Sequence, residues 1–384
     1  MLLDYETLKL IWWLLIGILL IGFAVTDGMD MGVGMLIPFL GETDSERRVI
    51  INAIAPHWDG NQVWFITAGG ALFAAWPAVY ATAFSGFYLA MLLVLAALFL
   101  RPVGFDYRSK LQDSKWRNAW DWALFVGGFV PALVFGVAFG NLIQGVPFHF
   151  NEFLQPKYEQ SFIWALLGLL NPFALLAGLV SVLMLATHGA AWLQLRAGEP
   201  VRTRARDAIG KLAPAVSILF ALAGVWVFFG IDGYRIVTQP PHDALPNPLA
   251  KEVVRESGAL MSIYREAPLA LLAPLLGLAM PWVVRLLSAG NRPGLAFVTS
   301  GFGIAGIIAT AGLSMFPFVM PSSTDLKSSL TVWDATSSHL TLSVMFWAVV
   351  VLLPIVLTYT VWAYWAMWGK VTVESIEENT HKVY

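Results

Sequence analysis

The amino-acid sequence predicts an all-α polytopic membrane protein: a single membrane domain over residues 1–384 with nine transmembrane helices. Of the 384 residues, 58% are hydrophobic and only 12% are charged, whereas a soluble domain carries about 25% charged residues. Apolar runs of about 20 residues, the length that crosses a bilayer, recur along the whole chain. The charges lie in short loops and sum to −2, so the composition does not indicate a nucleic-acid partner.

The nine predicted spans follow one another closely. Two loops between them are long, 230–268 and 317–340, and their mixture of Pro, Ser, Asp and aromatic residues predicts ordered caps rather than linkers. The spans themselves are expected at about 10–40, 50–76, 78–100, 120–144, 161–193, 212–230, 269–287, 294–319 and 340–368.

Basic residues predict the orientation. The loops after the odd-numbered spans hold 16 of the 23 Lys and Arg residues. Because cytoplasmic loops are enriched in Lys and Arg, we expect a periplasmic N-terminus and a cytoplasmic C-terminus. The alternation holds across all nine spans, which supports their number.

A polar segment interrupts the second span. The apolar run Val63–Trp76 is too short to cross a membrane by itself, so the span must include the polar residues of Ala55–Trp64. At about 1.5 Å per residue, Asp59 lies roughly 16 Å from the charged boundary at Arg48. A carboxylate at that depth costs roughly 2.5–3.5 kcal/mol and indicates a functional site. The alternative is a structural hydrogen-bond hub of Asp59 with its polar neighbours His57, Asn61 and Gln62.

Two further acids, Asp27 and Asp30, fall in the first span at a similar depth. Their i, i+3 spacing places them on one helix face. Gly28 and Gly32 form a small-xxx-small pattern that lets a second helix approach closely. The sequence therefore predicts a buried helix interface that contains these two acids, whose contribution is either functional or confined to helix packing.

Asp106 follows the third span at the cytoplasmic side. An acid at this mouth and Asp59 deeper in the membrane form two possible steps of a proton relay. The alternative is a loop carboxylate paired with Arg101 or Arg108.

Cysteine and histidine usage argues against a metal centre in this chain. The absence of cysteine excludes disulfides, iron–sulfur clusters, zinc thiolates and c-type haem attachment. No span carries the two stacked histidines of a bis-histidine cytochrome, so we expect no haem ligand and no metal ligand here. The histidines are His57, His149, His188, His242, His339 and His381.

Five segments carry a resemblance to a known family. The chain strongly resembles subunit II of the cytochrome bd ubiquinol oxidases, in order and over essentially its whole length. The segments are Gly22–Gly28 (GFAVTDG), Ala55–Trp64 (APHWDGNQVW), Arg101–Arg108 (RPVGFDYR), Phe316–Ser323 (FPFVMPSS) and Trp333–Ser338 (WDATSS).

The resemblance implies an arrangement for the nine helices. It implies a first four-helix bundle with the acidic membrane cluster over 1–150, a second four-helix bundle over 151–335, and a peripheral ninth helix with a cytoplasmic tail over 336–384. The family complex lies in the bacterial inner membrane. Its partners would be subunit I, lipid and quinone, and a very small third subunit in some complexes.

The resemblance also implies a function. The family complex oxidises quinol, reduces O₂ to water and builds a proton gradient. Its two haems b and one haem d are ligated by subunit I, and some members hold a structural ubiquinone in subunit II. The family's proton-path aspartates correspond to Asp59 and Asp106, with His57, Asn61 and Gln62 in support. The chain alone is expected to be inactive. The alternatives are a proton-coupled membrane carrier and a purely structural scaffold for the catalytic subunit.

Overall fold

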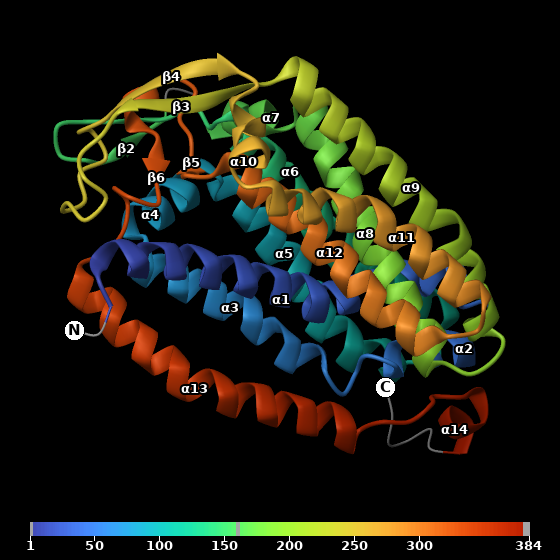
Figure 1. The fold of residues 1–384 in the computed structure, drawn as a ribbon. Helices are drawn as coiled ribbons and strands as arrows, with labels where there is room; N and C mark the ends of the chain where they lie inside the picture. Colours follow the sequence, from blue (N-terminus) through green and yellow to red (C-terminus); the bar gives the residue numbers. More distant parts are fainter. Residues whose placement is uncertain (1–2, 159–161, 379–384) are drawn as a thin grey trace.

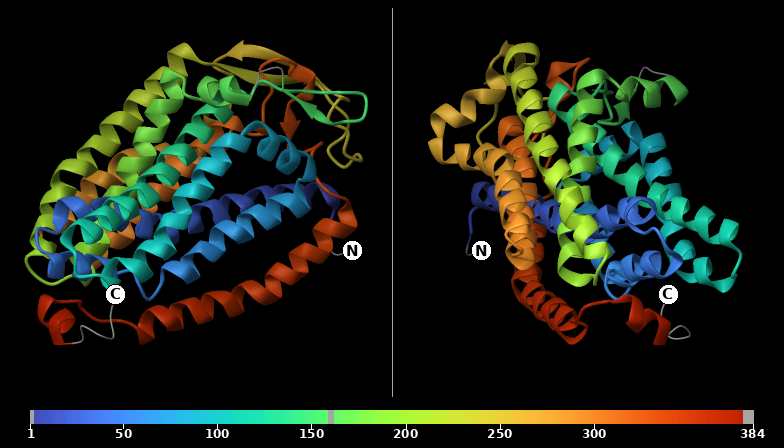
Figure 2. Two further views of the ribbon diagram at one scale, coloured as in Figure 1. Left: turned by 180° about the vertical axis from the view of Figure 1, so that it is seen from behind. Right: turned by 90° about the vertical axis from the view of Figure 1, so that its right-hand side faces the viewer.

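Long helices run between two ends of the molecule in the computed structural model, which describes residues 3–158 and 162–378 (Figures 1 and 2). Three small antiparallel β-hairpins gather at one end, called the hairpin end below, and the short helix α2 lies at the other, called the α2 end. The hairpins are β1 (His149–Phe150) with β2 (Pro156–Lys157), β3 (Asp232–Thr238) with β4 (Glu252–Ser257), and β5 (Phe318–Met320) with β6 (Leu330–Thr331).

The first half of the chain forms four long helices and their short connections. These are α1 (Tyr5–Leu40), α2 (Asp44–Asn52), α3 (Trp58–Ala75), α4 (Pro77–Gly86), α5 (Tyr88–Tyr107) and α6 (Ser114–Gln144). The second half forms α7 (Phe162–Leu169), α8 (Pro172–Arg196), α9 (Val201–Gly230), α10 (Ser262–Glu266), α11 (Leu272–Ala289), α12 (Pro293–Met315), α13 (His339–Ala366) and α14 (Val373–Glu378).

Eight helices in the described part of the chain are long and apolar enough to cross a membrane. Helix α3 is not among them, because its first two turns contain Asp59, Asn61 and Gln62. The prediction of nine transmembrane helices is therefore met in eight cases, and the membrane crossing by α3 stays a prediction.

The expected second span, 50–76, is wrong as a continuous helix. The chain leaves the helical path after Asn52 and resumes it at Trp58. Pro56 lacks a backbone N–H and disfavours the helical conformation of the residue before it, so an unbroken helix is strained here. The depth of Asp59 cannot be counted along a helix from Arg48.

Other predicted limits also need correction. The third span is divided between α4 and α5 at Phe87, and α5 continues to Tyr107, so Asp106 is helical rather than in a loop. The fifth span was expected from residue 161, which lies outside the described residues. It is divided between α7 and α8, because the side chain of Asn171 caps the N-terminus of α8 and Pro172 occupies its first position. The sixth begins eleven residues early, at Val201.

Helices α1, α6 and α8 pack against one another at the centre of the molecule. The predicted close approach at Gly28 and Gly32 is confirmed. A Cβ atom at Gly32 would lie 2.0 Å from the carbonyl oxygen of Leu185 on α8, and one at Gly28 would lie 2.7 Å from the Leu185 side chain. Only glycine permits this contact between α1 and α8.

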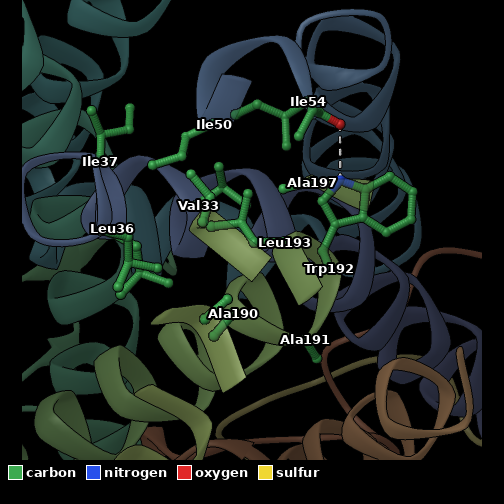
Figure 3. Packing of buried hydrophobic residues seen from close by; sticks show 14 of the residues in the cluster. Val33, Leu36, Ile37, Ile50, Ile54, Ala190, Ala191, Trp192, Leu193 and Ala197 are labelled. Atoms are coloured by element: carbon green, nitrogen blue, oxygen red, sulfur yellow. Dashed lines mark hydrogen bonds between the residues drawn. The ribbon is translucent and has the colours of Figure 1, made fainter. Parts of the chain in front are cut away.

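A buried apolar cluster closes the α2 end (Figure 3). The turn after α2 is fixed by Trp192 of α8, whose indole N–H donates to the carbonyl of Ala53 at 2.9 Å. The surrounding residues include Val33, Leu36 and Ile37 of α1, Ile50 and Ile54 near α2, and Ala190 and Leu193 of α8. This packing sets the position at which α3 begins.

The long loops at the hairpin end are ordered, as predicted. The ammonium nitrogen of Lys251 lies 2.8 Å from a carboxylate oxygen of Asp334. Burial lowers the pKa of Lys251 and raises the pKa of Asp334, and the attraction between the two groups opposes both shifts. Lys9 of α1 is fully buried and donates to three loop carbonyls, those of His242, Ala244 and Trp333.

Helix α13 lies along one side of the molecule, apart from the other long helices (Figure 1). Leu342 is its one buried residue, and its main helix contacts are with α1 and α3. The helix thus leaves most of its apolar surface uncovered.

Candidate functional site

Three charged side chains meet between α1 and α5 and are almost completely buried. The guanidinium of Arg101 donates to both carboxylate oxygens of Asp27, at 2.7 and 2.9 Å, and lies 3.8 Å from Asp30. Arg101, Asp27 and Asp30 are each at most 2% exposed. The predicted common face of Asp27 and Asp30 is confirmed, because both carboxylates turn toward the same guanidinium.

The cluster continues onto α3 and α13. The amide nitrogen of Asn61 donates to Asp30 at 2.8 Å, and the hydroxyl of Tyr364 donates to the Asn61 carbonyl oxygen at 2.8 Å. The ring of His57 stacks on Tyr364, with centroids 4.0 Å apart and planes 3° apart. A chain of polar contacts therefore runs from Asp27 to the end of α13.

Two buried atoms in this series of polar contacts have no hydrogen-bond partner among the described residues. They are Oδ1 of Asp30 and Nε2 of His57. Buried polar atoms are normally paired, so both mark positions where an additional group is expected.

Sequence reasoning missed Arg101 and Tyr364 as members of this cluster. The sequence places Arg101 beyond the end of a span, as a possible partner for Asp106, whereas α5 extends past it to Tyr107. Its place directly after an unbroken apolar run was the available signal. Tyr364 is 303 positions from Asn61, and no local pattern connects them.

Asp59 lies on the opposite side of α3 from Asn61 and is exposed. It makes no hydrogen bond or ion pair within residues 3–158 and 162–378. It heads a stripe of exposed apolar residues at helical spacing, Val63, Ile66 and Phe73. The hub expected from its neighbours does not form around Asp59: His57 and Asn61 turn inward to Tyr364 and Asp30. Gln62 is half-buried.

Asp106 has a similar place on α5. It is exposed at the end of an apolar stripe that includes Leu95, Phe99 and Val103. Beside it opens a surface cleft of about 540 Å³, lined by Asp106, Tyr107, Lys110, Leu111 and Trp116.

The arginines expected as alternative partners of Asp106 bind other acids. Arg101 holds Asp27, and Arg108 lies 2.5 Å from Asp121 of α6 and 2.9 Å from Asp44 of α2. The Arg108 contacts join the end of α5 to α2 and α6. They leave the carboxylate of Asp106 without an ion pair within the described residues.

Most histidines that the structure describes have contacts with other residues. The His57 ring is covered by Tyr364, and His149 has an interaction partner. His381 lies outside the described residues. The two ring nitrogens of His188 contact Ser300 and Val25, and those of His242 contact Glu6 and Gln239. Nε2 of His339 contacts the carbonyl of Leu3.

Comparison with known proteins gives concordant matches. Residues 8–367 match the family model described as cytochrome bd terminal oxidase subunit II. The chain is 59% identical to the cytochrome bd-I ubiquinol oxidase subunit 2 of Escherichia coli K12, covering 99% of this chain and 100% of that one. It is 32% identical to the cytochrome bd ubiquinol oxidase subunit 2 of Bacillus subtilis, covering 94% and 96%.

The fold has a counterpart among solved structures. A chain of the bd oxidase from Geobacillus thermodenitrificans superposes with a TM-score of 0.64 at 15% identity, covering 95% of this chain and 100% of that chain. At this identity the likeness concerns the fold.

Proposed function

Because this chain belongs to the cytochrome bd terminal oxidase subunit II family, we propose that it is the haem-poor subunit of a quinol:O₂ oxidoreductase and carries protons toward the oxygen-reducing haem. It is a multi-pass protein of the bacterial inner membrane. Family membership implies a subunit 1 partner and haem cofactors in the complex.

One observation carries the proposal: Asp59 is exposed on an apolar helix surface. A carboxylate that faces lipid costs roughly 2.5–3.5 kcal/mol near the middle of a membrane. Asn61, two residues on, contacts Asp30, which is ten residues from the end of α1, or roughly 15 Å deep at 1.5 Å per residue. Asn61 also contacts Tyr364, two residues before the end of α13, so Asp59 lies between the middle of the bilayer and the α2 end. An ionisable side chain on an otherwise apolar exposed surface is typical of a site that a partner protein covers.

The proposed partner surface is formed by α3 and α5. Their exposed stripes, headed by Asp59 and ended by Asp106, are apolar otherwise. Subunit I on this surface would shield both acids from lipid and enclose water between them. Membrane proton relays usually consist of carboxylates that are shielded from lipid by protein and connected by water.

We assign the direction of transfer from the charge distribution. The α2 end holds most of the basic residues and would face the cytoplasm, with the N-terminus of α1 in the periplasm. Asp106 would take protons from the adjacent cleft, and Asp59 would pass them to subunit I. His57 and Asn61 would hold the start of α3 in place through Tyr364 and Asp30, and Gln62 would order water near Asp59.

The haems would lie in subunit I as haem b and haem d, as family membership implies. When bound there, haem supplies oxygen binding and reduction. This chain would supply protons and a scaffold, within the bundles expected at 1–150 and 151–335 and the peripheral helix at 336–384. A structural ubiquinone and a very small third subunit are further parts of the proposal.

The proposal is tested with the purified complex carrying Asp59→Asn or Asp106→Asn. We expect quinol-dependent oxygen consumption to fall roughly 10²-fold or more for Asp59→Asn, the range for removal of a proton-transfer group. Haem content should stay at the wild-type level. Asp207→Asn is the matched control, because Asp207 is an exposed acid on α9, away from the α3–α5 surface.

Other outcomes contradict the proposal in distinct ways. Full activity with full haem in both variants would make the chain a scaffold with the proton path elsewhere. Loss of haem would make the acids structural. Proton-coupled solute uptake by this chain reconstituted alone would identify a carrier.

A further inference from the structure

The buried cluster between α1 and α5 holds more acids than bases. Asp27 and Asp30 share a single guanidinium, that of Arg101. If all three were ionised, the cluster would carry a net negative charge while each member is at most 2% exposed. Burying an unpaired charge is far more costly than burying a neutral carboxyl group.

The geometry distinguishes the two acids. Arg101 uses two of its nitrogens on the two oxygens of Asp27, at 2.7 and 2.9 Å, which is the bidentate arrangement of a strong ion pair. Asp30 is 3.8 Å from the guanidinium and receives one neutral hydrogen bond, from Asn61. Its Oδ1 has no partner among the described residues. The contacts of Asp27 favour its ionised form, and those of Asp30 do not.

We propose that Asp30 binds an exchangeable proton inside this subunit, at a site separate from Asp59 and Asp106. The proton balances the charge of the cluster: Asp27 stays ionised against Arg101, and Asp30 is a neutral carboxylic acid. This inference rests on the charge count and contacts of the buried cluster, so it stands whether or not the surface acids form a relay.

The contacts also supply a connection for exchange. Asn61 links Asp30 to the hydroxyl of Tyr364, and Tyr364 stacks on His57, whose Nε2 is buried and unpartnered. Tyr364 lies two residues before the end of α13, at the α2 end. The polar chain thus leads from Asp30 toward the end that we assign to the cytoplasm.

The groups that face Asp30 define what can influence its proton. Asp27 lies on the same helix, Arg101 on α5, and Asn61 on α3 with Tyr364 of α13 behind it. Arg196 of α8 lies beyond, with its guanidinium between the rings of Trp192 and Trp368. Of the charged groups nearest Asp30, Asp27 is an acid, and Arg101 is a base that already forms a bidentate ion pair with Asp27.

The charge count predicts the behaviour of substitutions at either acid. Asp30→Asn replaces the neutral acid by a neutral amide of the same shape. Asp27→Asn leaves Arg101 with Asp30 as its one carboxylate, so Asp30 must ionise. Both single variants keep a neutral cluster and should assemble with full haem, whereas the double variant leaves Arg101 uncompensated and should not assemble.

The test is infrared difference spectroscopy of the purified two-subunit complex during exchange from H₂O to D₂O. We expect a carboxylic-acid C=O stretching band that shifts on exchange in the wild-type complex. The band should vanish in Asp30→Asn and also in Asp27→Asn, where Asp30 is still present. Asp59→Asn is the control and should keep the band, because Asp59 does not contact this cluster.

Two results would overturn the inference. One is a band that persists in Asp30→Asn or in Asp27→Asn, since the charge count requires its loss in both. The other is the absence of any such band together with a sodium-dependent rise in thermal stability that Asp30→Asn abolishes, because a bound cation would then balance the cluster in place of the proton.

Discussion

Arg101 is the side chain on which the buried cluster depends. Its guanidinium joins α5 to α1 through Asp27 and compensates the charge of that buried carboxylate. The planar fork of arginine matches the two oxygens of a carboxylate, and the point charge of lysine does not. The contact is therefore specific to arginine.

Removing this partner should be strongly destabilising. We expect Arg101→Gln to cost about 3–5 kcal/mol, the typical loss when a buried ion pair is broken from one side. The measurement is the thermal unfolding temperature and haem retention of the purified complex. Adding Asp27→Asn to Arg101→Gln should recover part of the loss, because the unpaired acid is then neutral. Independent, additive effects of the two substitutions would contradict the pairing.

At the scale of elements, helix α2 is held by a side chain that belongs to its own first turn. Glu46 accepts hydrogen bonds from the backbone N–H groups of Glu42 and Thr43, and from Arg204 of α9 at 2.6 Å. Burial raises the pKa of Glu46, but these hydrogen bonds and the attraction of Arg204 outweigh it, so the pKa lies below its ordinary value. The carboxylate thus ties α2 to α9.

This contact predicts a pH dependence. A lowered carboxyl pKa contributes stability above the unfolded value, near 4.3, that is lost as the pH falls through the folded value. Glu46→Gln should therefore lower the thermal unfolding temperature at neutral pH, and its difference from wild type should shrink below about pH 4.3. Asp207→Asn, at a side chain 66% exposed, is the control. A difference that does not change with pH would refute the contribution of the charge.

The sequence predicted the existence of most helices but not their interruptions. Long apolar runs sufficed for α1, α6 and α13. They did not reveal the breaks at Pro56, at Phe87 and before Pro172. Helices that are apolar on all sides lack the hydrophobic periodicity from which a helix end could be recognised. Local rules for proline explain two of these breaks once they are seen.

The same limit applies to the site. Spacing alone placed Asp27 and Asp30 on one face, and composition marked Asp59 as unusual. The partners of these acids come from remote positions, Arg101 on α5 and Tyr364 on α13. A single sequence contains no signal for such pairings, so the hub was wrongly centred on Asp59.

At the scale of the whole molecule, the uncovered surfaces differ in kind. The exposed surface of α11 is mostly apolar, with Arg285 near its end, and Leu286 there is 71% exposed. Ile66 on α3 is also 71% exposed, but it shares its stripe with the carboxylate of Asp59. Under the proposed function, lipid would cover the first surface and subunit I the second.

A photo-crosslinking amino acid can distinguish the two surfaces. Introduced in place of Ile66, it should crosslink this chain to subunit I when membranes containing the complex are irradiated. Introduced in place of Leu286, with the same exposure, it should give no crosslinked pair. Equal crosslinking from both positions, or from Leu286 alone, would place the partner elsewhere.

Proton transfer through Asp59 and Asp106 is tested by the rate at which the complex takes up protons during oxygen reduction. The fully reduced complex, reconstituted in vesicles with the α2 end accessible to a pH-indicating dye, is mixed with oxygen while haem oxidation is followed by absorbance. We predict that Asp59→Asn slows proton uptake roughly 10²-fold while the initial binding of oxygen keeps its rate. Uptake at the wild-type rate in a complex that lacks both Asp59 and Asp106 would contradict the account.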